Sequence, residues 1–154
     1  MPDNKDIVPS FHGVSTHAVD GSRRVMIPIK WRPKDASIVF TVLAWPLDGE
    51  EYLLVLPPER WRVMLDKLKE NSLHDPEVAV LERVIGFNSA PLTLDRVGRF
   101  CLPENLAKLV GIEKEAEFVG RLDKFEIWSP GRLKKAMAQD NKSLAATVAK
   151  RINL

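Results

Sequence analysis

The sequence predicts an α+β fold in which one short unit of strand, helix and β-hairpin occurs twice. The segment VDGSRRVMIPIKW, at residues 19–31, and the segment LDRVGRFCLPENL, at residues 94–106, follow the same pattern. Each has an aspartate, an arginine four residues later, a short apolar strand and then a proline. Each is also followed by a hairpin pattern and a helix. One such unit is too small to bury a stable core alone, so the two copies are expected to cover each other's apolar faces in a pseudo-twofold β structure.

In the first unit, Val25 to Ile27 is expected to form a short strand. Pro28 then opens a stub helix that Pro33 ends early, because a proline inside a helix lacks the backbone donor and clashes with the preceding turn. The apolar, β-branched run 38–44 and the run 52–56 flank the turn sequence LDGEE, which predicts a β-hairpin.

Two helices are expected to link the units. The first opens at Pro57-Pro58-Glu59 and carries Trp61, Met64, Leu65 and Leu68 on one face. The second has Asp75 as N-cap and Pro76 in the first helical position. Its apolar stripe is Val78, Leu81, Val84 and Ile85. Helical spacing of this kind is typical of core packing.

The second unit repeats the order of the first. After the strand that ends at Leu102, residues 103–110 are expected to form a short helix that buries Leu106 and Leu109 and stops at Gly111. Residues 117–120 and 125–128 are expected to pair across the turn RLDK. Ser129 and Pro130 then start a helix that carries Leu133, Ala136 and Met137.

These elements divide the chain into five parts. They are an N-terminal arm at residues 1–11, the first unit at 12–59, the linking helices at 60–87, the second unit at 88–131 and a C-terminal helix with tail at 132–154. In the tail, Leu144, Val148 and Ile152 are spaced for one more amphipathic helix. Such a helix could pack on a neighbouring subunit or fray, because an isolated helix of this length is marginal in water.

Composition places the chain among globular proteins. Its 154 residues are 45% apolar and 29% charged, with a net charge of only +2. No apolar run reaches the length of a membrane span and the N-terminus has no secretory pattern, so a cytoplasmic location is expected. The single cysteine, Cys101, is expected to be a buried, inert thiol. Any nucleic-acid binding must depend on locally concentrated positive charge or on assembly.

No catalytic constellation is evident. The histidines His12, His17 and His74 lie near no paired motif, and the sequence has no glycine-rich phosphate cradle, metal-ligand cluster or nucleophile elbow. Catalysis with Asp20 or Asp95 as a general base is therefore rejected. We expect no metal, no cofactor and no small-molecule substrate.

The two Asp-x-x-x-Arg loops are the candidate functional feature. Arg24 and Arg99 can donate paired hydrogen bonds to phosphate or to a guanine edge. Asp20 and Asp95 would repel a DNA backbone, so they are expected to accept backbone donors in a turn or to orient the arginines. Spacing alone leaves open whether these arginines contact DNA or only form local ion pairs.

The repeated loops, the linking helices and the ending FEIWSPGRL at residues 125–133 closely resemble the MraZ family of bacterial transcriptional regulators, over about residues 12–135. The resemblance implies two AbrB-like units that form a swapped-hairpin β barrel, with protomers assembled into a ring. It also implies a regulator, cytoplasmic and nucleoid-associated, that binds double-stranded DNA at direct repeats upstream of the division and cell-wall gene cluster.

Carried onto this sequence, the resemblance places DNA contact first on Arg24 and then on Arg99, with Arg23 and Arg96 facing phosphates. Asp20, Asp95 and Gly98 would shape the loops. The family's first loop has a glycine where this chain has Arg23, so that turn is expected to be reshaped around Gly21. The second loop keeps Gly98 but has Val97 where the family has a polar residue.

An alternative is an antitoxin-like module that binds a protein partner, as related swapped-hairpin proteins do through a C-terminal extension. Such an extension is expected to be long and acidic or disordered. The tail of this chain is short and basic, which counts against the alternative.

Overall fold

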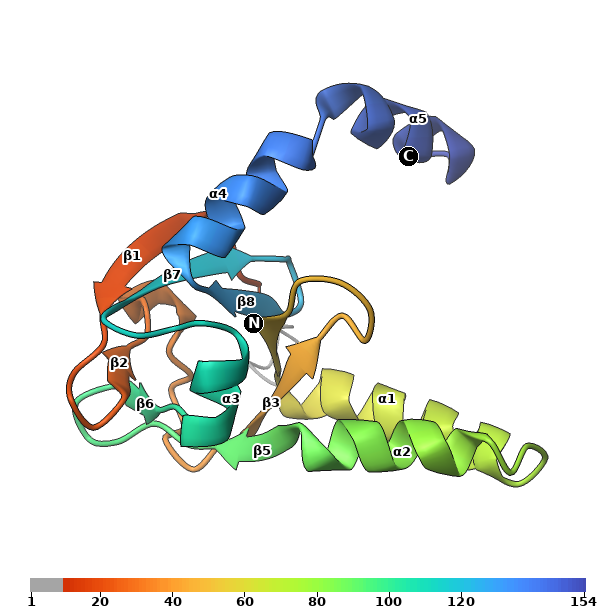
Figure 1. The fold of residues 1–154 in the computed structure, drawn as a ribbon, viewed down its shortest axis with the longest axis horizontal. Coiled ribbons are helices and arrows are strands. Elements are labelled where there is room, and N and C mark those ends of the chain that lie inside the picture. Colours follow the sequence, from red (N-terminus) through yellow and green to blue (C-terminus); the bar gives the residue numbers. More distant parts are fainter. Residues whose placement is uncertain (1–9) are drawn as a thin grey trace, which may run out of the picture.

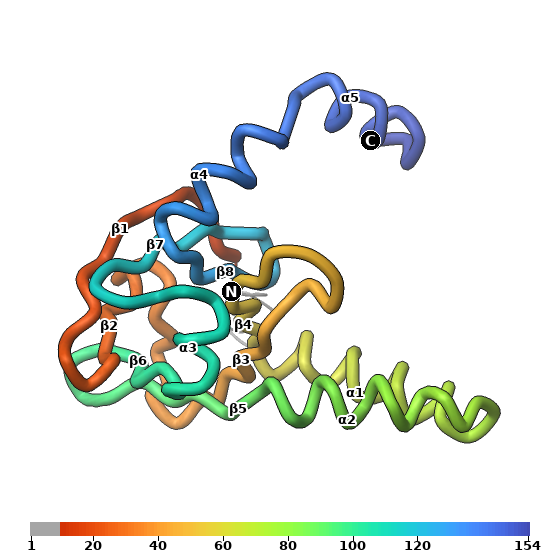
Figure 2. Tube along the Cα trace, in the orientation of Figure 1, coloured from red at the N-terminus to blue at the C-terminus, as the bar shows by residue number. Residues whose placement is uncertain are grey.

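The computed structural model describes residues 10–154, and the arm expected at residues 1–11 lies almost entirely outside that range. Figures 1 and 2 show a body of strands from which one pair of helices and the C-terminal helices extend.

The first unit contains β1 (Val14–Ala18), β2 (Arg24–Met26), the 3₁₀ helix η2 (Ile29–Trp31), β3 (Phe40–Trp45) and β4 (Tyr52–Leu56). The linking helices are α1 (Pro58–Ser72) and α2 (Val78–Phe87). The second unit and tail contain β5 (Ser89–Leu92), β6 (Arg99–Cys101), α3 (Glu104–Leu109), β7 (Glu115–Gly120), β8 (Phe125–Trp128), α4 (Pro130–Gln139) and α5 (Lys142–Arg151).

The two units exchange strands. Six strands form one antiparallel sheet in the order β1-β7-β8-β4-β3-β5, and β2 pairs with β6 in a second, two-stranded sheet. If each strand is replaced by its counterpart in the other unit, the six-strand order reads the same backwards. The first strand of each unit thus pairs with the hairpin of the other, which confirms the duplicated, swapped-hairpin α+β fold that the sequence predicts.

One main core lies between the two sheets. Val25 of β2 and Phe100 of β6 point into it, and the Phe100 ring stacks on Phe125 of β8 with centroids 6.4 Å apart. Trp31 of η2 and Leu106 of α3 enter the core from equivalent positions in the two units. Because both units contribute to this core, neither buries its apolar residues alone.

A second, smaller cluster lies between β3, β4 and the linking helices. Trp61, Met64 and Leu68 of α1 pack there with Leu81 and Ile85 of α2, so the helical spacing of these residues does mark packing. Helix α2 begins later than expected. The Asp75 side chain caps a preceding turn by accepting from the Glu77 N–H at 2.9 Å, and i→i+3 bonds lead into the helix.

Both hairpins form where the sequence predicts them. The sequence does not predict the two edge strands, β1 and β5. In β1 most side chains are polar, and β5 reads SAPL with a proline. Among residues 10–154, each has a pairing partner on one side only, β7 for β1 and β3 for β5. Proline and polar residues are tolerated at such edges, so these strands owe their conformation to long-range pairing with the other unit.

Two expectations about burial, for Cys101 and Leu109, are wrong. Cys101 is exposed, because Phe100 and Leu102 on either side of it are fully buried and strand geometry turns the residue between them outward. Leu109 is also exposed, whereas Ala107 of α3 and Val110, its C-cap, face the core. Met137 of α4 is exposed as well. Phe11, assigned to the arm, is buried beside Phe125.

The C-terminal tail is helical. Asn141 caps α5 by accepting from the Leu144 N–H at 2.6 Å, and the side chains of Leu144 and Ile152 are exposed. In Figure 1, α5 lies away from the sheets. Among the helices of residues 10–154, none has the length and apolar character that a membrane crossing requires.

Candidate nucleic-acid interface

The first Asp-x-x-x-Arg loop is held together by Asp20. One carboxylate oxygen accepts hydrogen bonds from the backbone N–H groups of Ser22 and Arg24, at 2.9 and 2.8 Å. The other oxygen accepts from Nε of the Arg24 guanidinium at 2.9 Å. The pKa of Asp20 is lowered, mainly because the Arg24 N–H bonds to the charged form, so the carboxylate stays ionised.

The second loop repeats this arrangement bond for bond. Asp95 accepts from the backbone N–H groups of Val97 and Arg99 at 3.0 and 2.9 Å, and from Nε of Arg99 at 2.8 Å. The pKa of Asp95 is likewise lowered, with the Arg99 backbone N–H as the main cause. Each aspartate is therefore bonded both to the backbone of its loop and to the side chain of its arginine.

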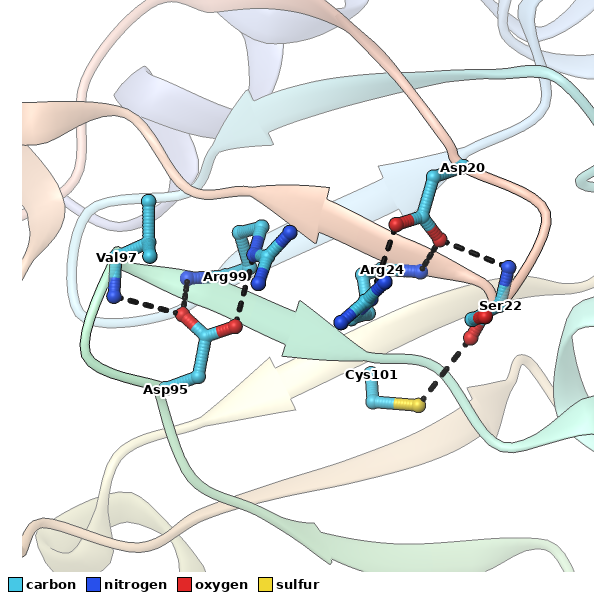
Figure 3. A network of polar contacts seen from close by, with 7 residues as sticks. All are labelled: Asp20, Ser22, Arg24, Asp95, Val97, Arg99 and Cys101. Atoms are coloured by element: carbon cyan, nitrogen blue, oxygen red, sulfur yellow. Dashed lines mark hydrogen bonds and ion pairs between the residues drawn. The ribbon is translucent and has the colours of Figure 1, made fainter.

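Strand pairing brings the two loops together on one surface, which Figure 3 shows from close by. In the β2–β6 pair, Arg24 lies opposite Cys101 and Met26 lies opposite Arg99. Since Val25 and Phe100 point into the core, these four residues share the outer face. The Arg24 side chain is 43% exposed and that of Arg99 is 28% exposed, so Arg24 is the more accessible of the two.

The guanidinium groups of Arg24 and Arg99 each keep unused hydrogen-bond donors. The aspartate takes only Nε, and within residues 10–154 the terminal nitrogens of Arg24 and Arg99 make no hydrogen bond. An arginine held in one orientation with free terminal N–H groups is suited to bidentate contact with a phosphate or a guanine edge. The local ion pair and DNA contact, which the sequence left as alternatives, are therefore compatible in this geometry.

The first loop is not reshaped around Gly21, contrary to expectation. Arg23 itself takes the left-handed conformation, with φ of 61°, at the position where the second loop has Gly98 with φ of 93°. The Arg23 side chain folds back and donates from Nε to the backbone carbonyl of Leu102 at 3.1 Å. Arg23 is thus partly engaged within the protein, whereas Arg96 is exposed on the second loop.

Sequence reasoning missed Arg32, which lies beside the second loop. Its Nε donates to the backbone carbonyl of Ile27 at 3.1 Å, and its guanidinium lies over Gly98. In the 75-residue repeat, Arg32 corresponds to Ala107, a buried residue of the second unit. This difference between the units is the sequence feature that could have drawn attention to Arg32.

In the part of the chain that the structure describes, His12 and His17 contact neighbouring serines and not the loop aspartates. His12 contacts the Ser10 hydroxyl and His17 contacts the Ser15 hydroxyl. Partial burial is the main cause that lowers the pKa of His17, with help from the nearby Arg32 charge. Over residues 10–154, no three His, Cys, Asp or Glu side chains gather in a way that could hold a metal ion.

The exchanged strands and the paired loops define a chain of two AbrB-like units. A family model described as "MraZ protein, putative antitoxin-like" matches residues 88–154. Three relatives are each named "Transcriptional regulator MraZ". The one from Lachnoclostridium phytofermentans is 35% identical over 79% of this chain and 83% of its own length. The one from Thermomicrobium roseum is 33% identical over 78% and 82%, and the one from Acidithiobacillus ferrooxidans is 31% identical over 79% and 84%. The chain belongs to the MraZ family.

Proposed function

We propose that this protein is a sequence-specific DNA-binding transcriptional regulator. The observation that carries the proposal is the pair of matching loops, whose aspartate-anchored arginines, Arg24 and Arg99, share the outer face of the β2–β6 sheet. The relatives' printed name supports transcriptional regulation and agrees with a protein that is not an enzyme. Arg24 is the main DNA contact, Arg99 the second, and Arg96 and the partly engaged Arg23 lie close to the phosphates.

The DNA target is a set of direct repeats upstream of the division and cell-wall gene cluster, and the acting form is a ring of protomers in the nucleoid. The resemblance seen in the loops and in the FEIWSPGRL segment supports this assignment. The small net charge of one protomer gives a physical reason for the assembly into a ring. A protomer with a net charge of +2 makes few phosphate contacts, whereas several loop pairs on one assembly can raise avidity by about 10²–10⁴.

The test is a titration of the purified protein into duplex DNA from immediately upstream of its own gene, with a shuffled duplex as control, across a salt series. We expect tight binding to the native duplex alone, weakening steeply as salt rises. Equal, weak binding to both duplexes would overturn the proposal. Mass measurement in solution tests the ring separately, since a value near one protomer would remove the avidity.

The antitoxin-like alternative has less support. The family description includes that term, but α5 is a short helix with Lys150 and Arg151 in its last turn rather than a long acidic extension. If neither duplex is bound specifically, a pull-down from cell lysate is the next experiment.

A further inference from the structure

A groove of about 560 Å³ lies next to Arg99, outside the two loops. It is lined by β1, by the end of β2 and by η2 with the residues around it. Of the described residues that line it, Lys30 and Arg32 are cationic and none is an aspartate or a glutamate. The groove is otherwise largely apolar, and these two unopposed positive charges suit contact with an anionic chain.

The groove is continuous with the face that carries the loop arginines. Met26 lies opposite Arg99 in the β2–β6 pair, and Met26 also lines the groove. Arg32 forms the other connection, because its guanidinium lies over Gly98, the residue before Arg99. A duplex that contacts Arg99 would therefore also lie against the adjoining groove.

The corresponding surface of the second unit is different. Counting 75 residues on from Ile29, Lys30 and Arg32 gives Glu104, Asn105 and Ala107. Glu104 is ionised with a lowered pKa, chiefly through its bond with Lys108, so a carboxylate stands where the first unit has Ile29. At these three positions the first unit therefore has two positive charges, whereas the second unit has one carboxylate, which is paired with Lys108.

We propose that the groove binds the phosphodiester backbone of the same DNA duplex that the loops hold, with Lys30 as its main phosphate contact, so that each protomer sits on DNA in one orientation. This inference rests on the proposed function. Lys30 is exposed, whereas Arg32 is partly buried with its guanidinium over Gly98, and acts as a positioning residue for the second loop. The His17 ring lines the groove and lies against Phe118 and near Arg32 and Glu117.

The test compares Lys30→Gln with Lys69→Gln. Both remove one exposed lysine charge, but Lys69 lies in the last turn of α1, on the far side of the molecule from β2 and β6 (Figure 1). The slope of log K against log salt should fall by about 0.9 for Lys30→Gln, the value for one lost phosphate contact on B-DNA. It should be unchanged for Lys69→Gln. Affinity should fall by the same factor for the native and the shuffled duplex, because phosphates carry no sequence information.

The outcomes separate this inference from the proposed function. If the parent protein prefers the native duplex and Lys30→Gln keeps the parent's slope, the groove assignment is wrong and the regulator assignment stands. An equal loss for both variants would also overturn the groove, since it would reflect net charge alone. If the parent has no preference for the native duplex, the proposed function is wrong, and the groove assignment that rests on it is wrong as well. Thermal unfolding of both variants verifies that the fold is intact.

Discussion

The guanidinium of Arg32 occupies the space that a side chain at Gly98 would need. A Cβ atom built on Gly98 would lie 2.6 Å from Cζ of Arg32, closer than real carbon atoms approach. In the other unit the relationship is inverted. Arg23 stands at the glycine position, and its own guanidinium bonds to the Leu102 carbonyl, as that of Arg32 bonds to the Ile27 carbonyl. Each loop therefore has one guanidinium at the equivalent carbonyl, supplied from a different position in the sequence.

Replacement of Gly98 by alanine should be destabilising. The residue has φ of 93°, a region that costs a non-glycine residue about 1–3 kcal/mol, and the new Cβ would displace Arg32. Urea unfolding should show this loss for Gly98→Ala. Gly21→Ala is the matched control, because Gly21 has open space around its Cβ position and no positive φ, and its stability should stay within about 0.5 kcal/mol of the parent. Equal stability of both variants would refute the account of the loop.

Arg24→Ala should weaken binding to the native duplex more than Arg99→Ala. The Arg24 side chain is the more exposed, and a lost bidentate base contact costs about 1–3 kcal/mol of discrimination. Titration of both variants into native and shuffled DNA measures this directly. Wild-type affinity of the Arg24→Ala protein, with an intact fold by circular dichroism, would show that the loop is not the contact.

Cys101 offers a chemical probe of the same surface. The thiol is exposed, lies opposite Arg24 and is the only cysteine of the chain. A small neutral alkylating reagent should therefore modify the native protein once, without denaturant. Native duplex DNA should slow the reaction if it covers the outer face of β2 and β6. An unreactive thiol would contradict the exposure, and an unchanged rate with saturating DNA would place the duplex elsewhere.

Tyr52, the only tyrosine, reports on the buried Glu126. Its ring stacks on Trp128, and burial, followed by the Glu126 charge, raises its pKa to about 12. Phenolate absorbance should therefore appear near pH 12 in the folded protein and near pH 10 in denaturant. Because the folded pKa is the higher one, the corresponding stability is complete below about pH 10 and is lost as the pH rises toward 12. Glu126→Gln should lower the tyrosine pKa, and a folded-state value near 10 in the parent would contradict the packing.

The sequence predicts the repeat and both hairpins, because these depend on local patterns. Turn residues, alternating apolar residues and the Asp-x-x-x-Arg spacing are each read within a few positions. The strands β1 and β5 have no such signal, since their partners lie in the other unit. Arg32 is missed for the same reason, as its importance comes from Gly98, which lies far along the chain. Strand alternation turns Cys101 outward because Phe100 and Leu102 face the core, so apolar neighbours in the sequence do not imply a buried thiol.

The reciprocal exchange of strands has a consequence for how the two loops can differ. In a dimer of identical half-length chains, every substitution would occur in both loops at once, so arginine at position 23 would also stand at position 98 and collide with Arg32. A single continuous polypeptide removes that constraint. Arg23 with Ala107 and Gly98 with Arg32 are two different solutions to one packing problem. Covalent linkage therefore frees each half to specialise while the shared core keeps them in register.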